Sequence, residues 1–202
     1  MKTLSLLGDA LRASRTALLP LGMLGMMASG CYHHTLPPAD QDTNPNHASD
    51  FVVIVQSGTD IQTVDMVSQS VEEWSTHSQG SFHPRVIVES FDPQEKAPIG
   101  QLRLYVDDHV NAHDPSQRGE TDYQNVRNRM RPHNGATIWV YSNQTADNLG
   151  KTIKHELGHA LGMDHYTADN GYPSVMRTTL PEVSDHLSSE DDVWLCYEWQ
   201  CN

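Results

Sequence analysis

Three histidines lie close together in residues 155–165, which read HELGHALGMDH. His155 and His159 are four residues apart, and His165 follows six residues later. On a helix, residues four apart share one face, so the first two imidazoles can bind the same ion. Imidazole nitrogens are common ligands of Zn²⁺, and three protein ligands leave one coordination position open, which is typical of a catalytic site. The segment therefore predicts a zinc site with these three histidines as ligands.

The residues between the histidines support a catalytic interpretation. Glu156 follows the first histidine, where its carboxylate can reach a water at the metal without binding the metal itself. Gly162 allows the chain to leave the helix with a positive φ and to bring His165 back as the third ligand. The alternative is a helix that carries three histidines by accident. The spacing of His165 and Gly162 favours the zinc site, with Glu156 as the catalytic residue.

The elements that must position this site are indicated by apolar patterning. Residues 145–161 are expected to form the helix that carries the first two histidines, with Thr145 or Asp147 as its cap. An earlier helix is expected from Ile61 to Trp74, where apolar residues recur at intervals of three and four. Four apolar, β-branched runs predict strands: Phe51–Val55, Arg85–Glu89, Leu102–Val106 and Ala136–Tyr141. The order strand, helix, strand predicts a twisted sheet with a crossover helix.

One long stretch, Asp107–Gly135, has no clear pattern. Its several histidines and aspartates could hold a second metal ion. The alternative is a solvated loop with a short helix around Tyr123–Arg131. Both interpretations remain open from the sequence.

The histidine pattern resembles that of the metzincin metalloproteases, in which a methionine-containing turn lies beneath the metal. Ser174-Val175-Met176, which ends eleven residues after His165, is similar to that Met-turn. The resemblance implies an α+β, zincin-like catalytic domain with a twisted mixed β-sheet, a long active-site helix, the Met-turn and a C-terminal helix. It also implies that residues 172–187 shape the pocket for the part of the substrate after the scissile bond.

Leu187–Tyr197 is similar to the closing helix of the matrixin branch of this group, and Trp74 before a strand also resembles matrixins. In matrixins, the region that corresponds to Asp107–Gly135 holds structural ions. The resemblance therefore adds Ca²⁺ or a second Zn²⁺ as an expected cofactor beside the catalytic Zn²⁺. Three acidic residues near the start of the closing helix are expected to act as cap and surface residues: Glu190, Asp191 and Asp192.

The N-terminus is typical of an export signal. Positively charged residues precede an apolar run from Ala17 to Ala28, and Ala28-Ser29-Gly30-Cys31 is similar to a bacterial lipoprotein signal. We expect residues 1–30 to be a lipoprotein-type signal peptide, Cys31 to carry lipid, residues 31–50 to be a disordered tether and residues 51–202 to be the catalytic domain. The protein would then be exported and anchored to a bacterial membrane, in the outer membrane or at the cell surface because Tyr32 follows the cysteine. The alternative is ordinary cleavage nearby and secretion.

Cysteine content and charge add two expectations. If Cys31 carries lipid, Cys196 and Cys201 remain of the three cysteines, and an exported chain can join them in a disulfide. The net charge of -13 argues against nucleic acid and anionic lipid as partners.

These features together predict a zinc-dependent endopeptidase that acts on a protein or peptide substrate. Glu156 would accept a proton from water as general base and pass it to the leaving amine as general acid. The substrate would lie extended along an edge strand of the sheet, and a monomer is expected. The alternative is a zinc-binding cell-surface lipoprotein or adhesion module with a degenerate protease fold. Glu156 argues against this alternative, because a structural zinc site has no need of that carboxylate.

Overall fold

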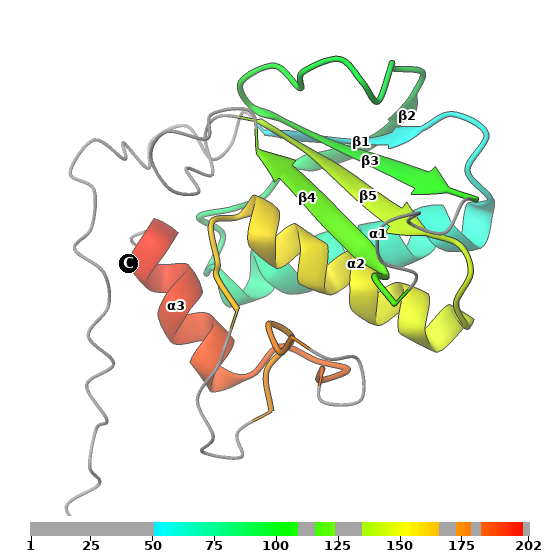
Figure 1. Cartoon of the computed structure of the whole chain (residues 1–202). Coiled ribbons are helices and arrows are strands. Elements are labelled where there is room, and N and C mark those ends of the chain that lie inside the picture. Colours follow the sequence, from blue (N-terminus) through cyan, green and yellow to red (C-terminus); the bar gives the residue numbers. More distant parts are fainter. Residues whose placement is uncertain (1–50, 109–115, 124–134, 166–172, 179–182, 200–202) are drawn as a thin grey trace, which may run out of the picture. The chain divides into compact units, whose positions relative to one another are not determined.

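The four predicted strands and one further strand form a mixed five-stranded sheet with the order β2-β1-β3-β5-β4 (Figure 1). The computed structural model describes residues 51–108, 116–123, 135–165, 173–178 and 183–199. Within these, β1 pairs in parallel with β2 and β3, β3 pairs in parallel with β5, and β4 runs antiparallel to β5. The strands are β1 (Val52–Gln56), β2 (Arg85–Glu89), β3 (Gln101–Asp107), β4 (Gly119–Tyr123) and β5 (Ala136–Tyr141). The expected α+β class with a mixed sheet is confirmed.

Strand β4 lies within Asp107–Gly135, where the sequence showed no clear pattern and no strand was expected in particular. Its sequence, GETDY, has no apolar alternation. An edge strand pairs with one neighbour and has one side open to solvent, so it needs little apolar surface. The short helix expected around Tyr123–Arg131 falls almost entirely outside the described residues, and Tyr123 ends β4.

Two helices pack on the same face of the sheet (Figure 1). Helix α1 (Ile61–His77) begins after Asp60, whose side chain accepts a hydrogen bond from the Thr63 amide. Helix α2 (Ala146–Ala160) begins after Thr145, whose hydroxyl accepts from the Asn148 amide at 3.4 Å. Thr145 rather than Asp147 is therefore the cap. These caps satisfy amides that have no partner within the helix, and they fix where each helix starts.

The contact between α1 and α2 is close because α2 contains a glycine at the point of contact. A Cβ on Gly158 would lie 2.3 Å from Met176 Sδ and 3.0 Å from Trp74 Cζ2. Trp74 is fully buried, and its indole N–H donates to the Lys154 carbonyl at 3.1 Å. In the core, α1, α2 and the segment around Met176 therefore meet at Gly158, which directly precedes His159 on α2.

Helix α3 (Ser189–Trp199) is the predicted closing helix. It lies near the C-terminal ends of α1 and α2 (Figure 1). The side chain of Leu195 on α3 is buried in the core. A hydrogen bond between Asp192 and His77 joins α3 to the end of α1. No helix of the described part is both long and apolar enough to span a membrane.

The chain divides into two units, Met1–Pro37 and Pro38–Asn202, and every described residue belongs to the second. The predicted signal peptide, Cys31 and the tether lie outside the described residues. Cys201 does too, so the disulfide between Cys196 and Cys201 remains a prediction.

Candidate metal centre

The three predicted ligands converge. His159 Nε2 lies 3.0 Å from His155 Nε2 and 3.1 Å from His165 Nε2. One nitrogen of each ring lies within 4.8 Å of the other two, and no other group of three or more His, Cys, Asp or Glu in the described residues meets this condition. Three nitrogens bound to one Zn²⁺ in tetrahedral geometry would be about 3.3 Å apart. The cluster could therefore hold a metal ion with small side-chain shifts.

The end of α2 brings the third histidine to the first two. The Gly162 amide donates to the His159 carbonyl at 2.8 Å, and the Met163 amide donates to the Gly158 carbonyl at 3.0 Å. Gly162 has a φ of 96°, a conformation that favours glycine because it has no Cβ. The predicted sharp turn is present, and it directs the chain back so that His165 reaches the other two histidines.

Hydrogen bonds to backbone carbonyls fix which ring nitrogen is available for a metal. His155 Nδ1 donates to the Val175 carbonyl at 2.7 Å, and His159 Nδ1 donates to the Met163 carbonyl at 2.8 Å. A ring that donates through Nδ1 carries its lone pair on Nε2. Partners of this kind fix ring orientation and increase the basicity of a metal ligand.

Burial keeps both helical histidines neutral. It lowers the pKa of His155 and, together with the neighbouring His155 ring, lowers the pKa of His159 to about 4. Metal binding requires the neutral imidazole. At neutral pH these two rings are therefore ready to bind a cation without first losing a proton.

A buried aspartate from α3 holds the turn that contains Met176. Asp191 is 2% exposed and accepts hydrogen bonds from the Ser174 hydroxyl at 2.6 Å and from the Val175 amide at 3.3 Å. It also accepts from the Ser188 amide and thus caps α3. The expectation of a cap is confirmed for Asp191, but the expectation of a surface position is wrong. Because the Val175 carbonyl accepts from His155, Asp191 supports a candidate metal ligand through the backbone of a single residue, Val175.

Glu156 lies on the same helix and is 5% exposed. The Thr121 hydroxyl on β4 donates to Glu156 Oε2 at 2.7 Å. Burial raises the pKa of the Glu156 carboxyl to about 7, the Thr121 hydrogen bond opposes the rise, and the nearby charge of Glu120 adds to it. A cation held by the histidines would favour the ionised form. The carboxyl thus has the pKa of a group that can accept and release a proton near neutral pH.

Two further charged residues hold α2 in place. Lys154 directly precedes His155, and its Nζ lies 2.5 Å from Glu73 Oε2 on α1 and 2.5 Å from the Asp185 carbonyl. Glu73 Oε1 also accepts from the Leu187 amide at 2.7 Å. This ion pair joins α1, α2 and the segment before α3 beside the site.

The sequence identified the histidines, Glu156 and the turn around Met176, but not the residues that support them. The sequence contains one pattern that could have pointed to Asp191. A serine, Ser188, is followed three residues later by this acidic residue, which is a helix-capping pattern. No sequence pattern points to Thr121 or to the ion pair of Glu73 with Lys154, because each of these contacts joins residues far apart in the chain.

Comparisons with known proteins bear on the fold. No family model and no curated protein matches the sequence. Among solved structures, archaemetzincin from Methanopyrus kandleri matches with a TM-score of 0.50 and 15% identity over 78% of this chain and 99% of that chain. Metalloproteinase-II from Bacteroides fragilis matches with a TM-score of 0.48 and 13% identity over 74% of this chain and 52% of that chain.

A hatching enzyme zinc-protease from the medaka fish Oryzias latipes also matches, with a TM-score of 0.41 and 13% identity over 76% of this chain and 92% of that chain. At these identities the likeness concerns the fold. The match to archaemetzincin shows that this chain has the fold of the metzincin-type zinc metalloproteases.

Proposed function

We propose that this protein is a zinc-dependent endopeptidase. One observation carries the proposal: one imidazole nitrogen of each of three histidines lies within 4.8 Å of the other two, and helix α2, which supplies two of these histidines, also carries the buried carboxyl of Glu156. An adhesive or structural zinc site would not require that carboxyl. The metzincin-type fold supports the same conclusion.

His155, His159 and His165 would hold the metal. Imidazole ligands suit Zn²⁺ and several transition metals, and three ligands leave a position open for substrate or water. When bound, Zn²⁺ would supply Lewis acidity that lowers the pKa of water and polarises a carbonyl. The hydrogen bonds to the Val175 and Met163 carbonyls would hold two of the rings in place during the reaction.

Glu156 would transfer the proton. Its carboxylate accepts a proton from the attacking water as the water oxygen bonds to the carbonyl carbon. The carboxyl then delivers this proton to the amide nitrogen as the C–N bond breaks, which returns Glu156 to its ionised form. Burial raises the pKa of the Glu156 carboxyl, and a bound cation would favour the ionised form that accepts the proton.

The substrate would be a protein or peptide bound in an extended form along β4. β4 is the edge of the sheet on the α2 side, and its Thr121 contacts Glu156 (Figure 1). A peptide that adds to this edge would form main-chain hydrogen bonds and so lie beside the histidines. By analogy with metzincins, residues 172–187 would shape the pocket beyond the scissile bond.

The test is cleavage of an internally quenched peptide and of casein by the zinc-loaded domain. We expect 1,10-phenanthroline to abolish cleavage, added Zn²⁺ to restore it, and mass spectrometry to find products cut at internal peptide bonds. Cleavage that survives complete removal of the metal would contradict the proposal. A protein with one bound zinc that cuts neither substrate would favour the zinc-binding module.

A further inference from the structure

Strand β4 contacts the carboxyl of Glu156 through a single side chain. The Thr121 hydroxyl lies 2.7 Å from Glu156 Oε2 and 3.0 Å from the Glu156 backbone carbonyl. A hydroxyl has one proton to donate, and the shorter contact is to the carboxylate, which is the stronger acceptor. Thr121 therefore engages one carboxylate oxygen of Glu156, Oε2.

The same strand makes room for this carboxyl two residues earlier. A Cβ on Gly119 would lie 2.7 Å from Glu156 Cγ and 2.8 Å from Glu156 Oε1. Residues two apart on a strand share a face, so Gly119 and Thr121 both face α2. Any side chain at Gly119 would require Glu156 to move, and Thr152 as well, because the same Cβ would lie 2.7 Å from Thr152 Cγ2.

We propose that Thr121 is a positioning residue that holds the Glu156 carboxylate in its reactive orientation, in the space left by Gly119. The inference rests on the proposed function and extends it by assigning a role to β4. The strand that would pair with the substrate also sets the orientation of the proton-transfer group. A peptide bound at this edge would therefore be placed relative to Glu156 by a single rigid element.

The test compares two substitutions that differ in one group. Thr121→Val removes the hydroxyl and keeps the β-branched shape, whereas Thr121→Ser keeps the hydroxyl. We expect Thr121→Val to lower kcat by about 10–100-fold with KM and zinc content unchanged, as is typical when a supporting partner of a catalytic group is lost. Thr121→Ser should retain a kcat close to that of the wild type.

A second measurement does not depend on activity. The infrared carboxylate band of Glu156, assigned by difference from Glu156→Gln in zinc-loaded protein at alkaline pH, should shift in Thr121→Val and stay in place in Thr121→Ser. A wild-type kcat and an unshifted band in Thr121→Val would overturn the inference.

The two proposals can fail separately. A wild-type protein that cleaves no peptide would overturn the proposed function, and the infrared band would still show whether Thr121 holds Glu156.

As a further variant, Gly119→Ala should shift the same infrared band because its Cβ displaces the Glu156 carboxyl. An unchanged band in this variant would count against the role of β4.

Discussion

At the scale of single residues, the site depends on groups that bind no metal. The carbonyls of Val175 and Met163 leave Nε2 of two histidines available, and Thr121 engages one oxygen of Glu156. The candidate ligands His155 and His159 could be predicted because a spacing of four residues gives them a common helix face, and Glu156 and His165 follow from the motif around them. The supporting groups could not, because Thr121 is 35 residues from Glu156 and no local pattern connects them.

Gly158 offers a prediction at this scale. Gly158→Ala places a Cβ 2.3 Å from Met176 Sδ, so the core must shift. We expect the free energy of unfolding to fall by about 1–3 kcal/mol, the usual effect of overpacking. Gly150→Ala on the same helix is the control, because its Cβ would meet nothing within 4 Å.

The control should increase the free energy of unfolding by about 0.5–1 kcal/mol, since alanine is the better helix former. Urea titrations of both variants measure the two values. Equal effects of the two substitutions would show that the contact of α2 with Met176 is not tight.

At the scale of elements, α3 supports the candidate metal centre through Asp191. Asp191→Asn removes a buried charge that accepts hydrogen bonds from Ser174 and Val175. We expect the free energy of unfolding to fall by about 1–3 kcal/mol. We also expect zinc affinity to fall by about tenfold or more, because the Val175 carbonyl orients His155.

Competition with a chromophoric chelator measures the zinc affinity of this variant. Glu190→Gln is the control, because it removes a carboxylate from the same helical turn with none of the hydrogen bonds to Ser174 and Val175. The role assigned to Asp191 would be refuted if both variants bound zinc as tightly as the wild type.

The ion pair between Glu73 on α1 and Lys154 on α2 makes the free energy of unfolding depend on pH. Burial alone would raise the pKa of Glu73. Hydrogen bonds from Lys154 and from the Leu187 amide, together with the positive charge of Lys154, have the larger effect and lower this pKa below its ordinary value. A carboxyl whose pKa is lower in the folded state stabilises the fold above its ordinary pKa. The contribution is lost as the pH falls through the folded-state value.

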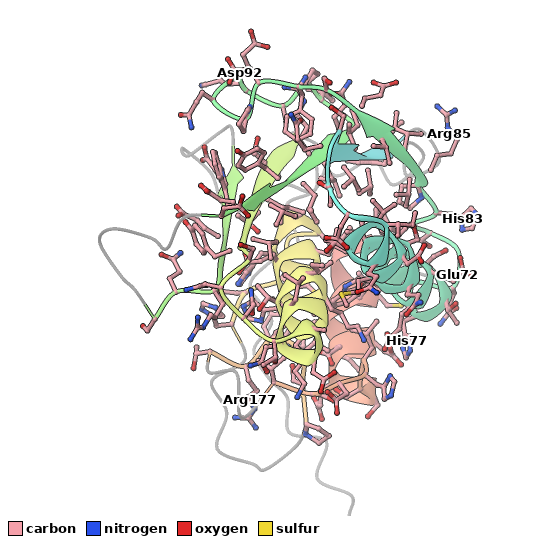
Figure 2. The ribbon with its side chains drawn as sticks, turned by 90° about the vertical axis from the view of Figure 1, so that its right-hand side faces the viewer. Glu72, His77, His83, Arg85, Asp92 and Arg177 are labelled. Atoms are coloured by element: carbon pink, nitrogen blue, oxygen red, sulfur yellow. The ribbon has the colours of Figure 1, made fainter. Side chains whose placement is uncertain are left out.

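Glu73→Gln should therefore lower the free energy of unfolding by a constant amount above about pH 4.5, and the difference from the wild type should shrink at lower pH. Urea titrations across this range give the difference. Glu72→Gln is the matched control, because Glu72 directly precedes Glu73 in α1 and its side chain is exposed (Figure 2). A pH-independent difference would show that the ion pair does not cause the effect of Glu73.

Elements differed in how well they could be predicted. β1, β3, β5 and both sheet-covering helices have apolar patterns that determine which face is buried, and they lie where expected within a few residues. β4 could not be predicted because GETDY is polar and pairs on one side only. Its position follows from the antiparallel ladder with β5, which is a contact between distant parts of the chain.

At the scale of the whole molecule, the fold class was predictable because the histidine motif, the turn around Met176 and the closing helix occur in the order of a metzincin. The strand order β2-β1-β3-β5-β4 was not, because apolar runs alone do not determine which strands are neighbours. The N-terminal features and the disulfide remain predictions.

We propose that Cys31 is lipidated and that residues 32–50 tether the catalytic domain to a bacterial membrane. The small residues before Cys31 motivate this proposal. Expression of the full chain should give a membrane-associated product whose N-terminal peptide carries acyl groups, and Cys31→Ser should abolish this modification. A soluble wild-type product that is cut at another position would contradict the anchoring.

The central claim is that Glu156 transfers the proton at a zinc site formed by three histidines. The most direct measurement is the rate of peptide cleavage by Glu156→Gln relative to the wild type at equal zinc content. We predict one zinc per chain in both proteins and a rate at least about 10²–10⁴-fold lower in the variant, the usual contribution of general acid–base catalysis. A zinc-loaded Glu156→Gln protein that cleaves the peptide at the wild-type rate would contradict the account.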